Sequence, residues 1–279
     1  MERIAARGLT FEVRLDGPAD GEPVLLLHGF PQDSRVWGPI SERLHAAGLR
    51  TVVPNQRGYS PDARPGPVEA YRVTECAADA AALLDALGIE SAHVVGHDWG
   101  AVAAWNLAGR HPEHVRTLTA VSVPHPAAAA QAIALDPEQQ QLSSYIGLFR
   151  QAGTAEQALL ADDAKLLRAM LVESGLTEPF IERYVEAVSD RAVLTAGLNW
   201  YRALTLLDLD GLGPITCPTT YVWGDRDTFF GKFSVERCAD HVSGPYQHVP
   251  LPGVTHWIPE QEPEVLADLI VDRIGSLQH

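Results

Sequence analysis

The stretch Gly96-His97-Asp98-Trp99-Gly100 decides the fold. An apolar run over 92–95 precedes it and predicts a buried strand, and an Ala-rich run over 101–108 follows it and predicts a helix. A strand, a sharp turn and a helix, with one reactive residue between two glycines, present that residue at a strained tip. Glycines are required there because a Cβ two positions before or after the tip would clash with neighbouring backbone. We therefore expect Asp98 to be a nucleophile at a strand end.

The tip residue is an aspartate rather than a serine. A carboxylate attacks an ester carbonyl poorly, but it displaces a leaving group from a saturated carbon and forms an alkyl ester that water can cleave. No Gly-x-Ser-x-Gly occurs elsewhere, which excludes a serine esterase. The motif favours chemistry on epoxides or on carbon–halogen bonds.

Composition narrows the class of protein. The 279 residues suffice for one large α/β domain with an insertion, and the net charge of −15 disfavours nucleic acid and anionic membranes as partners. No apolar run is long enough to span a bilayer, and the N-terminus lacks a signal-peptide pattern. Three scattered cysteines, Cys76, Cys217 and Cys238, indicate free thiols in the cytoplasm. An oligomer is compatible with all of these features.

Strands and helices alternate along most of the chain. Strands are predicted at 24–27, 50–54, 92–95, 117–123, 219–223 and 246–251, with helices at 41–47, 73–87, 101–108 and 263–274. This alternation predicts an α/β fold with a mostly parallel, doubly covered sheet. After Pro124 the pattern is helical to about Leu212. We therefore expect a first core segment over 1–124, a helical lid over 125–212 and a second core segment over 213–279, with the lid above the carboxyl ends of the strands.

Candidate catalytic groups follow three strands in the order nucleophile, acid, histidine. The acid is Asp225 or Asp227, both just after one strand, and His256 follows the last strand. This is the order of the Ser-Asp-His type of triad, with Asp98 in the first place. A lone Asp or His at a strand end is usually a loop cap, but three in this order with the turn at 96–100 favour catalysis.

A second motif, His28-Gly29-Phe30-Pro31, also ends a strand. Its role would lie in the backbone, because the N–H groups of Phe30 and Trp99 could form an oxyanion hole. That hole would stabilise the oxyanion that forms when water attacks the ester on Asp98.

These motifs resemble those of the epoxide hydrolases of the α/β-hydrolase superfamily, over nearly the whole chain. His28-Gly29-Phe30-Pro31 is similar to their HGxP motif, and the resemblance selects Asp227 as the acid because it stands three residues after Gly224. The segments 145–149 and 198–202 resemble those that carry two lid tyrosines. The resemblance implies that Tyr145 and Tyr201 hydrogen-bond the epoxide oxygen. It also implies no cofactor and a small, apolar epoxide as the substrate.

Without the resemblance, the residue pattern gives weaker support for Tyr145 and Tyr201 as the residues that hydrogen-bond the epoxide oxygen. Tyr145 and Tyr201 each lie on an apolar helical face, where tyrosines are usually core residues, and Tyr184 ranks equally with them. An alkoxide leaving group needs a proton donor, and a phenol is suitable. We expect the rest of the substrate pocket to include four further residues: His28, Pro31, Trp200 and Trp257.

One loop departs from the family pattern. Asn55 and Ser60 stand where an aspartate and a glycine are usual, which changes the local turn without removing a catalytic group. The cluster His111-Pro112-Glu113-His114 is interpreted as a helix terminus rather than a metal site, since the proline breaks a shared helical face.

The main alternative is a haloalkane dehalogenase, which shares the Asp nucleophile and the following tryptophan. Those enzymes hold the halide with an Asn after the His-Gly pair or with a lid tryptophan, whereas this chain has Phe30, and its Trp200 lies about 100° round the helix from Tyr201. Fluoroacetate dehalogenases have arginines at the places of Trp99 and Val102. The third alternative is a non-catalytic receptor of the same fold. The favoured mechanism forms a covalent ester on Asp98, hydrolysed to a vicinal diol by water that His256 activates.

Overall fold

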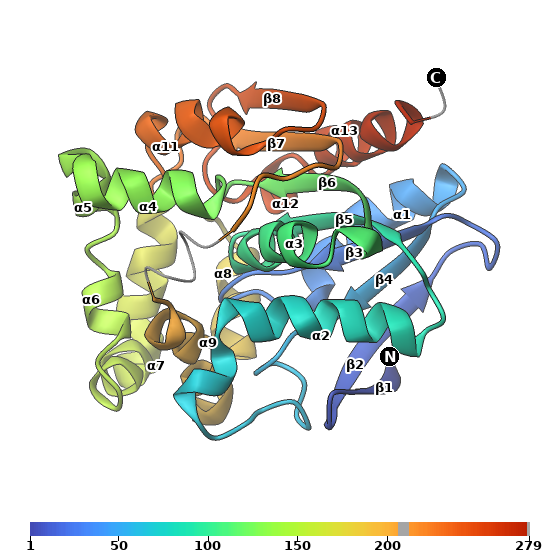
Figure 1. Ribbon diagram of the computed structural model, residues 1–279. Helices are drawn as coiled ribbons and strands as arrows, with labels where there is room; N and C mark the ends of the chain where they lie inside the picture. Colours follow the sequence, from blue (N-terminus) through green and yellow to red (C-terminus); the bar gives the residue numbers. More distant parts are fainter. Residues whose placement is uncertain (206–211, 278–279) are drawn as a thin grey trace.

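The computed structural model describes residues 1–205 and 212–277 (Figure 1). Its centre is an eight-stranded sheet in the order β1-β2-β4-β3-β5-β6-β7-β8. The first two pairings, β1 with β2 and β2 with β4, are antiparallel, and all the others are parallel. The predicted mostly parallel α/β sheet is confirmed. The strands are β1 (Glu2–Ala6), β2 (Leu9–Asp16), β3 (Pro23–Leu27), β4 (Arg50–Pro54), β5 (Ala92–His97), β6 (Val115–Val121), β7 (Thr219–Gly224) and β8 (Tyr246–Leu251).

Helices cover both faces of the sheet (Figure 1). The helices α2 (Val73–Ala86) and α3 (Trp99–Arg110) lie on one face, and α1 (Gly38–Ala46) packs with α13 (Pro263–Gly275) on the other. The short α11 (Lys232–Arg237) and α12 (Ile258–Gln261) complete the core. Two hydrophobic clusters follow this division, and central β5 is buried along its whole length because both of its faces are covered.

A helical insertion separates β6 from β7. Its described helices are α4 (Pro126–Leu135), α5 (Pro137–Leu142), α6 (Ile146–Phe149), α7 (Thr154–Glu173), α8 (Phe180–Ala187) and α9 (Arg191–Ala203). In Figure 1 they gather at one end of the sheet. Residues 206–211 of the predicted lid segment lie outside the described residues. The α7 helix is interrupted at Ala161–Ala164, where the backbone leaves helical geometry.

The register of the parallel strands places their carboxyl ends at one edge. Leu27 of β3 pairs with Gly96 of β5, and His97 pairs with Val121 of β6. Gly224 of β7 pairs with Leu251 of β8. The loops that follow β3, β5, β7 and β8 therefore meet at the end of the sheet where the helical insertion lies.

The loop at Asn55 and Ser60 forms a hydrogen-bonded turn of its own. The hydroxyl of Ser60 donates to the Asn55 carbonyl at 2.6 Å and accepts from the N–H of Glu12 at 2.9 Å. The Asn55 side chain accepts from the N–H of Ser34 at 3.0 Å. The serine hydroxyl thus ties this turn to β2.

Two further observations concern the chain as a whole. Cys76, Cys217 and Cys238 are free thiols. Within residues 1–205 and 212–277, no helix combines the length and the apolar character needed to cross a membrane.

Candidate active site

The turn that carries Asp98 is as tight as its glycines indicate. Asp98 has φ 53° and ψ −123°, a left-handed backbone that L-residues rarely adopt. A Cβ on Gly96 would lie 2.2 Å from the Gly100 carbonyl oxygen, and a Cβ on Gly100 would lie 2.0 Å from the Leu27 carbonyl oxygen. Both positions require glycine because the clash in each case is with backbone, which cannot move aside.

The Asp98 carboxylate is held by backbone donors and faces a histidine. The N–H of Phe30 donates to Oδ1 at 2.7 Å, and the N–H of Trp99 also donates to the carboxylate. His256 Nε2 lies 3.4 Å from Oδ2. Burial alone would raise the pKa of Asp98, but these contacts, with His256 the largest of them, lower it below its usual value. Asp98 is therefore ionised at neutral pH.

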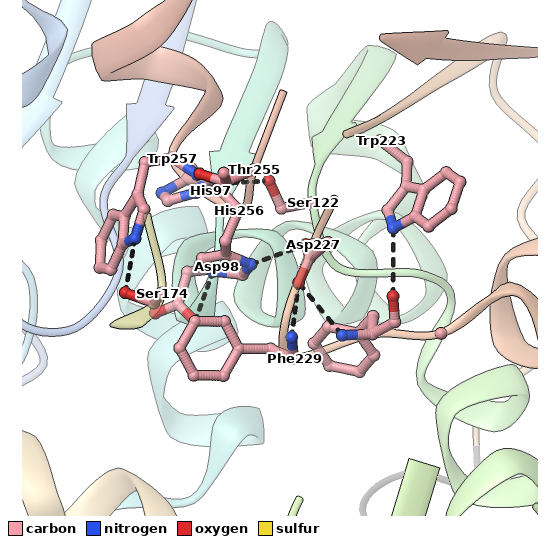
Figure 2. A network of polar contacts seen from close by, with 12 residues as sticks. His97, Asp98, Ser122, Ser174, Trp223, Asp227, Phe229, Thr255, His256 and Trp257 are labelled. Atoms are coloured by element: carbon pink, nitrogen blue, oxygen red, sulfur yellow. Dashed lines mark hydrogen bonds and ion pairs between the residues drawn. The ribbon is translucent and has the colours of Figure 1, made fainter. Parts of the chain in front are cut away.

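The histidine is oriented by a second, fully buried carboxylate (Figure 2). Asp227 Oδ2 lies 2.8 Å from His256 Nδ1, and Asp227 Oδ1 accepts from the N–H groups of Phe229 and Phe230 at 2.7 and 3.1 Å. Burial disfavours the charged imidazolium, but the carboxylates of Asp227 and Asp98 outweigh it and raise the pKa of His256 to about 10. Asp225 lies outside this network, since it accepts from the N–H of Gly253 in an exposed turn at 2.7 Å.

Two tyrosines of the insertion share a cavity wall with Asp98. Tyr145 and Tyr201 have ring centroids 6.1 Å apart, and the ring of Trp99 packs edge-on against Tyr201 with centroids 4.8 Å apart. Burial, with Asp98 close by, raises the pKa of both phenols, so both keep their protons at neutral pH.

Tyr184, which the residues alone rank equally with this pair, lies elsewhere. It is fully buried, and its hydroxyl donates to the carboxylate of Glu260. It lines neither of the two cavities that reach Asp98.

Two apolar cavities meet at Asp98. The first, of about 410 Å³, and the second, of about 620 Å³, share four wall residues: Asp98, Tyr145, Tyr201 and Phe229. The first cavity is also lined by Phe30, Pro31, Phe149, Leu167, Met170, Leu171, Ser174, His256 and Trp257. The second is also lined by Trp99, Val102, Val123, Pro126, Ala129, Ile133, Ser143, Ile146, Leu204 and Phe230. Among the described residues that line these two cavities, Asp98 is the one carboxylate and His256 the one histidine, and none is a lysine or arginine, so the space suits apolar groups.

The expected pocket residues divide into two pairs. Pro31 and Trp257 line the first cavity. His28 and Trp200 line neither cavity, which corrects the expectation for both. His28 is fully buried and accepts from the N–H of Gln56 at 3.1 Å, while Trp200 donates to the carbonyl of Arg57 at 3.1 Å. Both side chains hold the loop after β4 instead.

Phe229 and the residues of α7 that line the first cavity are absent from the predicted site. Phe229 lines both cavities and its N–H holds Asp227, and its place two residues after that acid is the only local signal. Leu167, Met170 and Leu171 face the first cavity from α7, a spacing that marks one helical face but equally fits a core face. Among the described residues, no group of three or more potential metal ligands is placed to hold an ion.

Comparisons with known proteins agree with this geometry. A family model described as the alpha/beta hydrolase fold matches residues 22–263. The chain is 33% identical to the AB hydrolase superfamily protein YfhM of Bacillus subtilis, covering 98% of this chain and 97% of that protein. It is also 33% identical to Epoxide hydrolase A of Mycobacterium tuberculosis, covering 92% and 93%.

Solved structures with a similar fold also include epoxide hydrolases. The epoxide hydrolase from Bacillus megaterium, in an F128A mutant complexed with its diol product, superposes with a TM-score of 0.87 at 25% identity, covering 98% of this chain and all of that one. Epoxide Hydrolase A from Mycobacterium thermoresistibile gives a TM-score of 0.84 at 27% identity, covering 98% and 97%. The chain therefore belongs to the α/β-hydrolase family, with relatives that include epoxide hydrolases.

Proposed function

We propose that the protein is an epoxide hydrolase that converts an apolar epoxide to a vicinal diol through a covalent ester on Asp98. The observation that carries the proposal is the placement of one ionised carboxylate, two protonated phenols and one carboxylate-paired histidine around the same apolar space. The relatives named as epoxide hydrolases support the same activity.

In the first step, Asp98 attacks one epoxide carbon from its buried tip. The C–O bond of the ring breaks, and the oxygen that leaves takes a proton from Tyr145 or Tyr201. The helical insertion supplies these donors, and we propose that it acts as a lid. The product of this step is a hydroxyalkyl ester on Asp98.

In the second step, His256 removes a proton from water, which attacks the carbonyl carbon of that ester. The oxyanion is stabilised by the backbone N–H groups of Phe30 and Trp99, which already donate to the Asp98 carboxylate in the resting protein. Asp227 holds the imidazole and stabilises its charged form. The ester bond then breaks, the leaving alkoxide takes the proton from His256, and the diol leaves. The carboxylic acid left on Asp98 gives its proton to the tyrosinate formed in the first step, which regenerates both groups.

The dehalogenase alternative lacks the second halide donor that would act beside Trp99. Phe30 stands in place of an asparagine and has no side-chain donor, and the indole N–H of Trp200 donates to the Arg57 carbonyl at 3.1 Å, away from both cavities. We therefore expect diol from styrene oxide and little or no bromide from a bromoalkane. Rapid bromide release would favour the dehalogenase, and inactivity on both would favour a non-catalytic receptor.

The covalent step is tested by removing the base. His256→Ala should open one equivalent of styrene oxide and then stop, leaving the mass of one substrate on the peptide that carries Asp98. Asp98→Ala should show neither turnover nor added mass. A single turnover in ¹⁸O water should give unlabelled diol and place label in the protein. Solvent oxygen in the first-cycle diol, with Asp98 unlabelled, would refute the two-step mechanism.

A further inference from the structure

One buried side chain, Gln32, links three catalytic loops. Its Oε1 accepts from the N–H of Gly29 at 2.8 Å, next to the oxyanion donor Phe30. The same oxygen lies 2.9 Å from Nδ1 of His97, the residue before the nucleophile. His97 Nε2 in turn lies 2.9 Å from the carbonyl oxygen of His256. The loops after β3, β5 and β8 are thus joined behind the reacting atoms.

The contacts of Gln32 require one orientation of its amide. The Gly29 N–H is a donor, so the amide oxygen must face it, and the NH₂ group must then point the other way. In that direction Nε2 donates to Oε1 of Glu260 at 2.7 Å. Gln32 is fully buried, so no water replaces a lost partner, and a flipped amide would set two donors against each other.

His97 connects the Gln32 side chain to the backbone of His256. Both of its ring nitrogens face acceptor oxygens, one on Gln32 and one on the His256 backbone. Burial lowers the pKa of His97 to about 3, so the neutral ring has one N–H and donates to one of the two oxygens at a time. Ser122 also donates to the His256 carbonyl, at 2.7 Å (Figure 2). The backbone of His256 is therefore fixed from the side of β5 and β6.

Glu260 anchors the other end of Gln32 and has no role in the two chemical steps. It lies in α12, four residues after His256, and is 8% exposed. Its Oε1 accepts from Gln32 and from the Tyr184 hydroxyl, while Oε2 has no hydrogen-bond partner among the described residues. Burying a carboxyl with one oxygen unpaired is costly, so this position is better explained by a role of the carboxyl than by packing alone.

We propose that Glu260 is a positioning residue for ester hydrolysis: by accepting from Gln32 it fixes the oxyanion loop through Gly29 and the His256 backbone through His97. This inference rests on the proposed function. It concerns the second step because hydrolysis needs both the Phe30 N–H and His256 in place. Ring opening needs the Asp98 carboxylate and the phenols of Tyr145 and Tyr201, but it does not need His256 as a base. The Phe30 N–H also donates to Asp98, so a displaced oxyanion loop removes one contact of the nucleophile in the first step. In the second step the same displacement removes both an oxyanion donor and the placement of the base.

The test measures ring opening and ester hydrolysis separately in variants of Glu260. Glu260→Leu removes the acceptor and should slow ester hydrolysis by roughly tenfold to 10²-fold while ring opening changes far less. Protein quenched during styrene oxide turnover should then carry the ester mass on the Asp98 peptide. Glu260→Gln keeps an acceptor oxygen and should restore most of the hydrolysis rate. Gln32→Met, which removes the amide, should accumulate the ester as Glu260→Leu does.

Tyr184→Phe is the matched control, since it removes the other donor to Glu260 and leaves the contact with Gln32. It should lower the melting temperature and hydrolyse the ester at about the parental rate. The proposal is overturned if Glu260→Leu and Gln32→Met show no ester accumulation, or if Glu260→Gln and Tyr184→Phe slow both steps as much as Glu260→Leu does. If the parental protein opens no epoxide, the proposed function itself has failed.

Discussion

At the scale of single residues, the site depends on which groups hold protons. Asp98 has a lowered pKa and is ionised, while Tyr145 and Tyr201 have raised pKa values and are protonated. In the proposed mechanism, the nucleophile and the proton donors thereby have the protonation states they need at neutral pH without any prior proton transfer. Different environments within one site give a carboxylate and phenols opposite roles.

The two tyrosines can be tested by removing their hydroxyls. Tyr145→Phe and Tyr201→Phe should each slow ring opening, and the double variant should lose more, within the roughly 10²–10⁴-fold range of general-acid catalysis. The measurement is the single-turnover rate of ester formation, and the apparent affinity for the epoxide should change far less. Tyr184→Phe serves as the control. Ring opening at the parental rate in both single variants would contradict the assignment.

His256 makes the second step depend on pH. Its pKa, about 10 in the resting protein, is raised by two carboxylates, and ester formation removes the charge of one of them, Asp98. The pKa must therefore fall in the ester form, and His256 becomes a base as pH rises through that lower value. Ring opening needs ionised Asp98 and protonated Tyr145 and Tyr201, and the lowered pKa of Asp98 and the raised pKa values of both phenols keep these forms present at mildly acidic pH, so ring opening should persist there.

We therefore expect the ester to accumulate on the protein at about pH 5 and to disappear at about pH 8, because a neutral His256 is present only on the alkaline side. Mass spectrometry of the protein quenched during turnover at each pH gives the ester fraction. An ester fraction that does not change with pH, or that rises with it, would contradict the role of His256 as base.

At the scale of elements, the turn between β5 and α3 is the part of the structure that tolerates least change. Gly100→Ala should cost about 2 kcal/mol or more in the free energy of unfolding, since the added methyl meets the Leu27 carbonyl at 2.0 Å. Urea unfolding measures this cost. Gly147→Ala is the matched control, because its Cβ would meet nothing within 4 Å, and it should be neutral or slightly stabilising. Equal stability of both variants would contradict the steric argument.

The core strands could be predicted because each is a short apolar run that ends in turn residues. The observed β4 and β8 have the predicted bounds, and the others differ by a few residues. The antiparallel β1 and β2 are absent from the predicted strands. Of the two, β1 lies at the sheet edge and is mostly exposed or half-buried, so it has little apolar periodicity. In contrast, β2 pairs with both β1 and β4, and its apolar and polar residues alternate over Leu9–Asp16, a two-residue period that the prediction left unused.

The site residues also divide into those with a local sequence signal and those whose placement depends on tertiary packing. Asp98, the acid and the histidine follow strand ends and have local signals. The choice between Asp225 and Asp227 depends on which side chain faces His256, and the exclusion of His28 and Trp200 from the cavities depends on the loop after β4. Such facing relations arise from tertiary packing, so the sequence pattern cannot contain them.

At the scale of the whole molecule, the sheet and the insertion together enclose space on two sides of the nucleophile. The first cavity extends toward α7, and the second toward α4, and they meet at Asp98, Tyr145, Tyr201 and Phe229. An epoxide held between the nucleophile and the phenols can place one carbon substituent on each side. The protein should therefore accept epoxides with an apolar group on both carbons, such as trans-stilbene oxide.

Filling one cavity at a time tests this arrangement. Ala129→Phe narrows the second cavity and Leu171→Trp narrows the first, and each should lower kcat/KM for trans-stilbene oxide by roughly tenfold or more. Styrene oxide has one phenyl group, which can use whichever cavity remains open, so each single variant should keep most of its activity and only the double variant should lose it. Retained styrene oxide activity also shows that the single variants are folded. If one of the two variants leaves trans-stilbene oxide turnover unchanged while the other abolishes turnover of both substrates, one cavity alone binds the substrate and the two-sided arrangement is wrong.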